Sequence, residues 1–171
     1  MKNKIIFFTL LCLLGIESIR ADNAYLRATS LTTQLPEGTG RTLVKMDSVD
    51  EIKNAELTNN RERVTVKEPG IYFITSSGQV GAISPGAKGY IDMWFEKNGK
   101  PVVNSTSRMT LTTSTDTAPM TNAIVIALNA GDTIATAYAA SGPSLGFVFL
   151  QPANEPACAS FLFSLFKINN L

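Results

Sequence analysis

Most of the chain after residue 22 consists of short segments in which apolar and polar residues alternate with a period of two. Apolar residues rarely recur at the three- and four-residue spacing of an amphipathic helix. Turn dipeptides rich in glycine and proline separate the segments, as at Pro69-Gly70, Asn98-Gly99 and Ser141-Gly142. Short alternating segments punctuated by such turns predict an all-β sandwich.

Two hairpins are the clearest local predictions. The first joins residues 90–95 to residues 102–103 through Asn98-Gly99, a dipeptide that suits the positive φ angles of a type I′ turn. One face of its first strand carries Ile91, Met93 and Phe95, and the other carries Tyr90, Asp92 and Trp94. The second predicted hairpin joins residues 123–128 to residues 133–138 through the turn at residues 129–132.

Two of the predicted strands are apolar on both faces. One is residues 123–128. The other is the C-terminal segment, residues 160–168, in which Phe161, Phe163 and Leu165 alternate with Leu162, Phe166 and Ile168. A strand of this kind needs cover on both sides, whereas an antiparallel sandwich covers only one face with its own core. Either association with another subunit or a loop of the same chain would supply the second cover.

The N-terminus has the pattern of a secretory signal peptide. Lys2 and Lys4 precede an apolar run over residues 5–16, and Ala21 is a small residue at the expected cleavage site. The run is shorter than the roughly 20 residues that a membrane-spanning helix needs. We therefore expect a signal peptide at residues 1–21, and a product that is secreted and extracellular, or periplasmic in a bacterium.

Charge and cysteine content narrow the possible partners. Cleavage would remove Lys2, Lys4 and Arg20 together with Glu17, which changes the formal net charge from +1 to −1. This near-neutral balance predicts no nucleic-acid partner, and no transmembrane anchor is expected in the mature form. Cys158 would be the one remaining cysteine, either as a buried free thiol or in an intermolecular disulfide.

The chain contains no histidine. Its absence excludes Ser-His-Asp and Cys-His nucleophile systems and the commonest general base at neutral pH. Carboxylate pairs could in principle support hydrolysis, and the candidates are Asp92 with Glu96 and the group Asp47, Asp50 and Glu51. Solvated surface acids are the favoured interpretation of both groups, so the sequence predicts a protein that is not an enzyme.

Residues 63–74 resemble the signature of the complement component 1q globular heads and, more loosely, of the tumour necrosis factor ligands. Gly70 and Tyr72 match the Gly-x-Tyr of that signature, and Leu57 occupies a position where the component 1q pattern accepts leucine. Val64 and Ile74 stand where the pattern has phenylalanine.

Two later segments add to this resemblance in the same order. Residues 124–134, with Gly131-Asp132 between two apolar runs, are similar to the late hairpin of the family. Residues 163–168 are similar to the last strand of the tumour necrosis factor ligands, with Ser164 in place of the usual glycine. The resemblance covers residues 45–168. The cleavable signal favours the component 1q-like branch, in a secreted form without a collagen stem.

The resemblance implies a ten-stranded antiparallel jelly-roll sandwich of the tumour necrosis factor type that assembles as a trimer. Residues 22–44 would form an N-terminal arm and the first strand or strands, and residues 45–171 the component 1q-like domain. Aromatic residues of the inner sheets would pack along the three-fold axis. The expected trimer-interface residues are Tyr72, Tyr90, Trp94, Phe161, Phe163 and Phe166. Tyr90 and Trp94 are alternatively an exposed aromatic ledge for a ligand.

Some component 1q-like trimers hold calcium near the axis, so oxygen ligands were considered. The candidates are Asp47, Asp50, Asp116 and Asp132, but none of their spacings is diagnostic. Asp132 is better explained as a cap of its own turn. The metal site is left unknown, and no cofactor is predicted. Asn104-Ser105-Thr106 is a glycosylation sequon, relevant in a eukaryotic source.

Three functional hypotheses follow. The first is a secreted, homotrimeric, non-enzymatic recognition module for a protein, glycan or cell-surface ligand. The second is a structural trimer that decorates a surface or an extracellular assembly, with residues 22–34 as its docking arm. The third and most remote is a histidine-free carboxylate hydrolase. The identity of the ligand cannot be read from the sequence.

Overall fold

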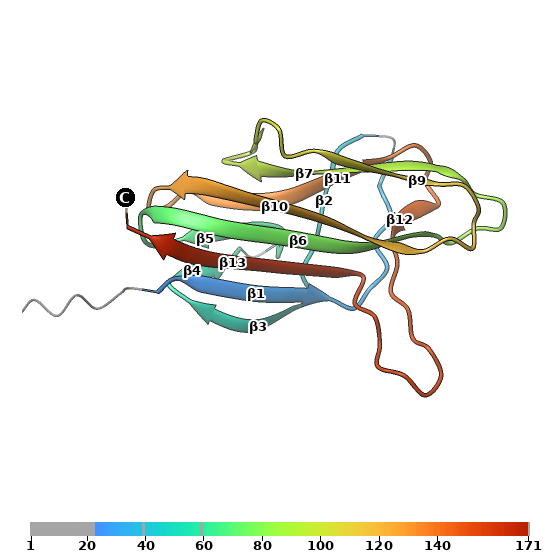
Figure 1. Ribbon diagram of the computed structural model, residues 1–171, viewed down its shortest axis with the longest axis horizontal. Helices are drawn as coiled ribbons and strands as arrows, with labels where there is room; N and C mark the ends of the chain where they lie inside the picture. Colours follow the sequence, from blue (N-terminus) through green and yellow to red (C-terminus); the bar gives the residue numbers. More distant parts are fainter. Residues whose placement is uncertain (1–22, 39, 59, 171) are drawn as a thin grey trace, which may run out of the picture.

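The structure is a computed structural model that describes residues 23–170 except 39 and 59. The described residues form two antiparallel sheets packed face to face (Figure 1). The predicted signal peptide, with Cys12 and the cleavage site at Ala21, lies outside the described residues. In the part of the chain that is described, no helix is long and apolar enough to span a membrane.

Sheet A has the strand order β10-β6-β13-β1-β3, with β12 paired to β6. Its strands are β10 (Ala118–Leu128), β6 (Gly70–Ala82), β13 (Phe161–Asn169), β1 (Tyr25–Ser30), β3 (Ser48–Lys53) and β12 (Leu145–Phe147). Sheet B has the order β4-β5-β11-β7-β8, with β2 paired to β11 and β9 to β7. Its strands are β4 (Ala55–Leu57), β5 (Val64–Val66), β11 (Thr133–Ala140), β7 (Gly89–Lys97), β8 (Lys100–Pro101), β2 (Thr42–Leu43) and β9 (Ser107–Leu111).

The prediction of an all-β antiparallel jelly-roll sandwich is confirmed. The described residues contain thirteen strands rather than ten, because short segments such as β2, β8 and β12 pair for only two or three residues.

The core lies between the two sheets and follows the predicted alternation. Ile91, Met93 and Phe95 face it from β7, and Phe161, Phe163 and Leu165 face it from β13. The rings of Tyr138, Phe147 and Phe161 form a chain of tilted contacts with centroid distances of 4.9 and 5.1 Å. Gly78 of β6 leaves room for this cluster, since a Cβ there would lie 2.3 Å from the Phe147 ring.

The first predicted hairpin is present, although its return strand is β8, Lys100–Pro101, rather than residues 102–103. β7 pairs with β8, and Lys97 faces Lys100 across the turn. Asn98 and Gly99 have φ angles of 51° and 78°, as a type I′ turn requires at its two central positions. The local sequence therefore determines this turn.

The second predicted hairpin is wrong. β10 pairs with β6 in sheet A, whereas β11 pairs with β7 and β5 in sheet B, so residues 129–132 carry the chain from one sheet to the other. The turn is fixed to β5, because Gly131 donates its N–H to the Val66 carbonyl at 2.8 Å. A turn of this length can either close a hairpin within one sheet or carry the chain from one sheet to the other. The pairing of β10 with β6 and of β11 with β7, which are distant in sequence, selects the crossing.

Residues 23–34, the described part of the predicted docking arm, are not a free arm. Tyr25–Ser30 is β1, which lies between β13 and β3 in sheet A, and its residues Leu26, Ala28 and Ser30 are fully buried. The N-terminal segment is therefore part of the sandwich, which removes the structural basis of the docking-arm hypothesis.

Asp132 caps the turn at residues 129–132, as predicted. Its carboxylate accepts hydrogen bonds from the Asn129 N–H at 2.8 Å and the Asn98 amide at 2.7 Å, and it forms an ion pair with Lys97 at 2.8 Å. Burial alone would raise the pKa of Asp132, but the hydrogen bonds from Asn98 and Lys97 outweigh it and lower that pKa to about 2.

Replacing Asp132 with asparagine is expected to lower the free energy of unfolding by about 1–2 kcal/mol at pH 7. The folded pKa lies below the ordinary value of roughly 4, so the charged carboxylate stabilises the fold above pH ~4, and this contribution is lost as the pH falls towards 2. Urea unfolding of both proteins at pH 7 and at low pH measures the difference. An equal difference at both pH values would show that the charge of Asp132 does not stabilise the turn.

Candidate functional site

An exposed apolar row crosses four strands on the outer face of sheet A. Val125 of β10 pairs with Phe73 of β6, Phe73 pairs with Phe166 of β13, and Phe166 pairs with Tyr25 of β1. Directly paired residues on one face of a sheet have adjacent side chains. Val125, Phe73, Phe166 and Tyr25, here called the apolar row, therefore form one continuous surface on the sheet that faces the viewer in Figure 1.

The apolar row is uncovered in the single subunit. Val125 is 64% exposed, Phe166 48% and Phe73 38%. Leu162 and Ile168 of β13 are also exposed large hydrophobic residues. A contiguous apolar patch of this kind marks an interaction surface in a soluble protein. The core thus covers one face of each of the two strands predicted to be apolar on both faces, and among the described residues no loop covers Val125 or Phe166 on the other face.

Three of the six predicted trimer-interface residues lie in the interior. Tyr72, Phe161 and Phe163 are enclosed between the two sheets, so a neighbouring subunit cannot contact them in this conformation. Tyr72 donates its hydroxyl to the Glu68 carbonyl at 2.8 Å, and burial raises the pKa of Tyr72 to about 12. The sequence showed two apolar faces on β13 but not which of them is inside. Phe166 is the predicted interface residue that lies in the apolar row.

Tyr90 and Trp94 lie on the outer face of sheet B, on the opposite side of the sandwich from Phe166. Tyr90 is 38% exposed, and the guanidinium of Arg108 stacks 3.8 Å from the centre of its ring. Arg108 also donates two hydrogen bonds of 2.7 Å to Asp92. Trp94 is half-buried. These residues form a partly exposed aromatic surface already occupied by a cation from the same chain.

Three of the candidate hydrolytic carboxylates, Asp92, Glu96 and Asp50, are engaged in ion pairs or hydrogen bonds, whereas Glu51 is exposed. Asp92 is held by Arg108, and the fully buried Glu96 accepts two hydrogen bonds from Arg41. Burial raises the pKa of Glu96, but the hydrogen bonds and charge of Arg41 outweigh this effect and lower it below its ordinary value. Asp50 pairs with Arg27 at 3.4 Å. Each of these three engaged acids has a structural role that accounts for its position.

Each of the four candidate calcium ligands, Asp47, Asp50, Asp116 and Asp132, is engaged by neighbouring groups of the chain. Asp47 accepts hydrogen bonds from Ser30, Leu31 and Thr32, and Asp116 accepts them from Thr112 and Thr113, four and three residues before it. Among residues 23–170, leaving out 39 and 59, no group of three acidic or cysteine side chains is placed to hold a metal ion.

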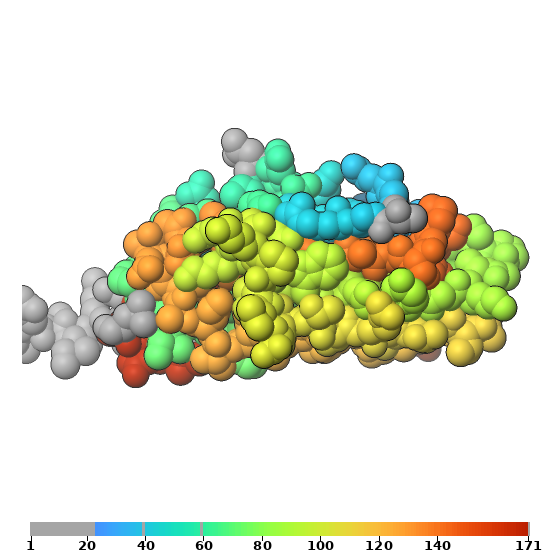
Figure 2. Space-filling model, turned by 90° about the horizontal axis from the view of Figure 1, so that it is seen from above, coloured from blue at the N-terminus to red at the C-terminus, as the bar shows by residue number. Residues whose placement is uncertain are grey.

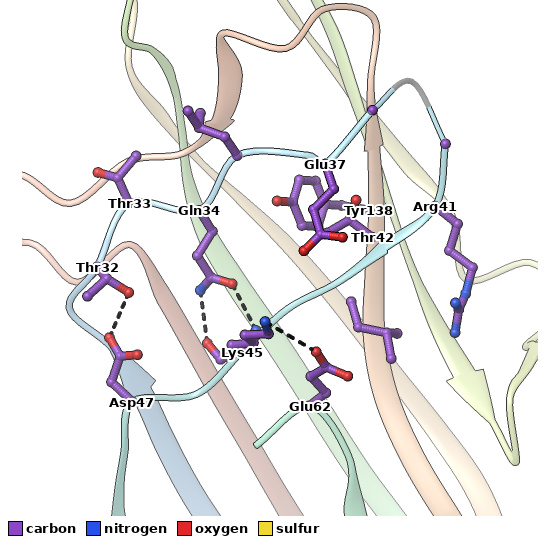
Figure 3. A pocket seen from close by; sticks show the side chains of 14 residues that line it. Thr32, Thr33, Gln34, Glu37, Arg41, Thr42, Lys45, Asp47, Glu62 and Tyr138 are labelled. Atoms are coloured by element: carbon purple, nitrogen blue, oxygen red, sulfur yellow. Dashed lines mark hydrogen bonds and ion pairs between the residues drawn. The ribbon is translucent and has the colours of Figure 1, made fainter. Parts of the chain in front are cut away.

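An open cavity of about 590 Å³ lies at the edge of the sandwich. The chain leaves β1 in sheet A, reaches β2 in sheet B and returns to β3 in sheet A, and the cavity lies between these two crossing segments. In the edge-on view of Figure 2, the segment around β2 (cyan) lies at the surface of the molecule along the upper border of the picture. Gln34 joins the crossings, because its amide donates to the Lys45 carbonyl at 2.9 Å and accepts from the Lys45 N–H at 2.8 Å (Figure 3).

Cys158 and Asn104 are both exposed. Cys158 lies in the connection between β12 and β13, where its backbone pairs with Leu150. The expectation of a buried free thiol is therefore wrong, and the intermolecular disulfide stays a prediction. Asn104 lies in the connection between β8 and β9 with a φ of 59°. Its use as a glycosylation site also stays a prediction.

Comparison with solved structures identifies the fold as that of the complement component 1q globular domain. The structure is similar to the globular domain of zebrafish complement 1qA protein with a TM-score of 0.60, and the match covers 87% of this chain and 99% of that domain. The two sequences are 13% identical over this match, so the likeness establishes the fold alone. No protein-family model and no curated protein sequence matches the chain.

Proposed function

We propose that this protein is a secreted, non-enzymatic recognition module of the component 1q-like type, without a collagen stem, that works as a homotrimer. The apolar row on sheet A is the observation that carries the proposal. Fully burying a large apolar side chain stabilises an assembly by about 1.5–3 kcal/mol, and the row presents several such side chains side by side. A second copy of the chain is the partner that every subunit encounters, and the fold is one that the resemblance associates with trimers.

The surroundings of the row suit a contact between subunits. Sheet A is continuous across five strands on this face, and polar residues such as Thr75, Ser77 and Ser164 continue the face beyond the row. An apolar centre with a polar surround is the usual anatomy of a protein interface. Closed symmetry would bury the row in every copy at once. The face of sheet A thereby takes the place of the interface expected at Tyr72, Phe161 and Phe163.

Recognition is proposed to occur on the surfaces that a trimer leaves free, which include the outer face of sheet B and the edge cavity. Three linked copies raise the affinity for a multivalent ligand without any new contact. The predicted signal peptide supports an extracellular location. Engagement of Asp92 and Glu96 by arginines supports a role other than hydrolysis.

Binding of the mature protein to arrays of glycans and of extracellular proteins tests recognition against the structural alternative. The recognition hypothesis predicts saturable binding to a restricted chemical class, and binding that weakens when the protein is made monomeric, because avidity is lost. A trimer that binds no member of either array, but that co-sediments with cell surfaces or extracellular assemblies, would favour the structural role instead.

A further inference from the structure

We propose that the edge cavity binds a neutral, polyhydroxylated ligand of mono- or disaccharide size. This inference rests on the proposed recognition function and names the ligand class. The cavity is formed within one subunit, so its test is separate from that of assembly. Its volume of about 590 Å³ falls in the range of small-molecule sites, roughly 300–1,000 Å³.

The walls of the cavity are held in place before any ligand arrives. The side chain of Gln34 bonds twice to the backbone of Lys45, and the backbone of Gln34 bonds twice to that of Phe147, at 2.8 and 3.0 Å. Asp47 holds the first crossing segment through the Leu31 N–H and the Thr32 hydroxyl at 2.8 and 3.0 Å. These contacts tie the two crossing segments to each other and to β12 of sheet A, which lowers the conformational entropy that is lost on binding.

The strongest sign of a ligand is the hydroxyl of Tyr138. Its side chain is fully buried and lines the cavity, and its hydroxyl has no hydrogen-bond partner among the described residues. Leaving a buried hydroxyl unsatisfied costs about 1–3 kcal/mol, so native structures rarely do so. Burial raises the pKa of Tyr138, and the charge of Glu37 raises it further, so the hydroxyl stays protonated at neutral pH and can donate a hydrogen bond.

Figure 3 shows how the polar groups gather around the cavity. Glu37 and Thr42 lie beside the Tyr138 ring, and Lys45 and Glu62 face each other across 3.7 Å on the opposite side. Donors and acceptors are thus present in comparable number. Leu35 and Leu43 add apolar surface. A sugar ring has this composition, with hydroxyls that both donate and accept and C–H groups that pack against apolar side chains.

The cavity is lined by charged side chains of both signs, which disfavours an ionic ligand. An anion would meet the carboxylates of Glu37, Asp47 and Glu62. A cation would meet the ammonium of Lys45 and the guanidinium of Arg41. A wholly apolar ligand would displace water from the lining polar groups and leave them without partners, which is costly. A neutral ligand rich in hydroxyl groups avoids all three penalties.

Nuclear magnetic resonance titration of the full mature protein tests the proposal. The probes are glucose, galactose, mannose and N-acetylglucosamine, with glucuronate and glucosamine as charged comparators of similar size. The expected result is saturable shifts of cavity residues with at least one neutral sugar, and weaker binding of the charged sugars. Tyr138→Phe is expected to weaken this binding by about tenfold, the equivalent of one lost hydrogen bond of ~1.4 kcal/mol.

Tyr72→Phe is the matched control. Tyr72 is as fully buried as Tyr138, but its hydroxyl bonds to the Glu68 carbonyl and does not line the cavity. This variant is expected to bind the sugar as the wild type does. The proposal is overturned if no neutral sugar produces saturable shifts, if Tyr138→Phe binds as tightly as the wild type, or if both variants weaken binding equally. Light scattering on the same samples reports assembly, so loss of the trimer and loss of sugar binding are distinguishable.

Discussion

Replacing Phe73 with aspartate is expected to convert the proposed homotrimer into folded monomers. Phe73 lies in the middle of the apolar row, between Val125 and Phe166, and it is 38% exposed in the single subunit. In the monomer, an aspartate here points into water. In the assembled trimer it would be a buried charge without a partner, which costs about 3–5 kcal/mol per site and weakens association at least ~100-fold. Light scattering measures the mass, and circular dichroism measures the fold.

Tyr90→Asp is the matched control for this variant. Tyr90 has the same exposed fraction, 38%, but lies on the outer face of sheet B. The sequence predicts Tyr90 at the interface, so comparing Phe73→Asp with Tyr90→Asp also shows whether the interface lies on sheet A or on sheet B. We expect Tyr90→Asp to remain trimeric. A trimeric Phe73→Asp together with a monomeric Tyr90→Asp would place the interface on sheet B and contradict the assignment made from the apolar row.

Replacing Phe161 with alanine is expected to lower the free energy of unfolding by about 3–5 kcal/mol. The Phe161 side chain is fully buried, and its ring packs 5.1 Å from that of Phe147, centre to centre. Removing it leaves a cavity in the aromatic cluster that closely packed neighbours cannot fill. Urea unfolding measures the change. It is made in the monomeric Phe73→Asp background, because trimer association would otherwise make the measured stability depend on concentration.

Phe166→Ala on the same strand provides the comparison. Phe166 is 48% exposed on the opposite face of β13, so its removal in the monomeric background is expected to change the unfolding free energy by less than about 1 kcal/mol. In the otherwise wild-type protein, the same change is expected to weaken the trimer. Equal destabilisation by Phe161→Ala and Phe166→Ala in the monomer would mean that the two faces of β13 are not core and surface as described.

The sequence predicts correctly which residues of a strand share a face, but it does not predict which face is buried in the core. Alternation correctly separated Phe161 and Phe163 from Leu162 and Phe166, because the two-residue period of a strand is a local property. Both sets are apolar, so hydrophobicity could not say which set faces the core. That choice depends on the register of β13 with β6 and β1, which joins segments far apart in the chain.

The Asn98-Gly99 turn and the turn at residues 129–132 show the same division. Positive φ angles at Asn98 and Gly99 follow from the residue types, and the hairpin was predicted correctly. The second turn also had suitable residues, but long-range pairing of β10 with β6 and of β11 with β7 places its two strands in different sheets. The residue types of a turn determine that the chain reverses there, and tertiary strand pairing determines which sheet the next strand joins.

The edge cavity could not be predicted from any motif. Its lining comes from the two crossing segments together with Glu62 and Tyr138, which no common spacing connects. Phe73 lies within residues 63–74, but the sequence does not predict it at the interface, because its neighbours Val125 and Phe166 become apparent only from the sheet register. The usable local signal is the apolar character of both faces in two strands, which indicates an exposed apolar face without locating it.

The mass of the mature wild-type protein in solution, measured by light scattering at micromolar concentration, tests the central claim most directly. Burial of the apolar row of sheet A in a closed three-fold assembly predicts three times the subunit mass. A protein that has the mass of one subunit under these conditions, with its apolar row left in water, would contradict the proposed homotrimer.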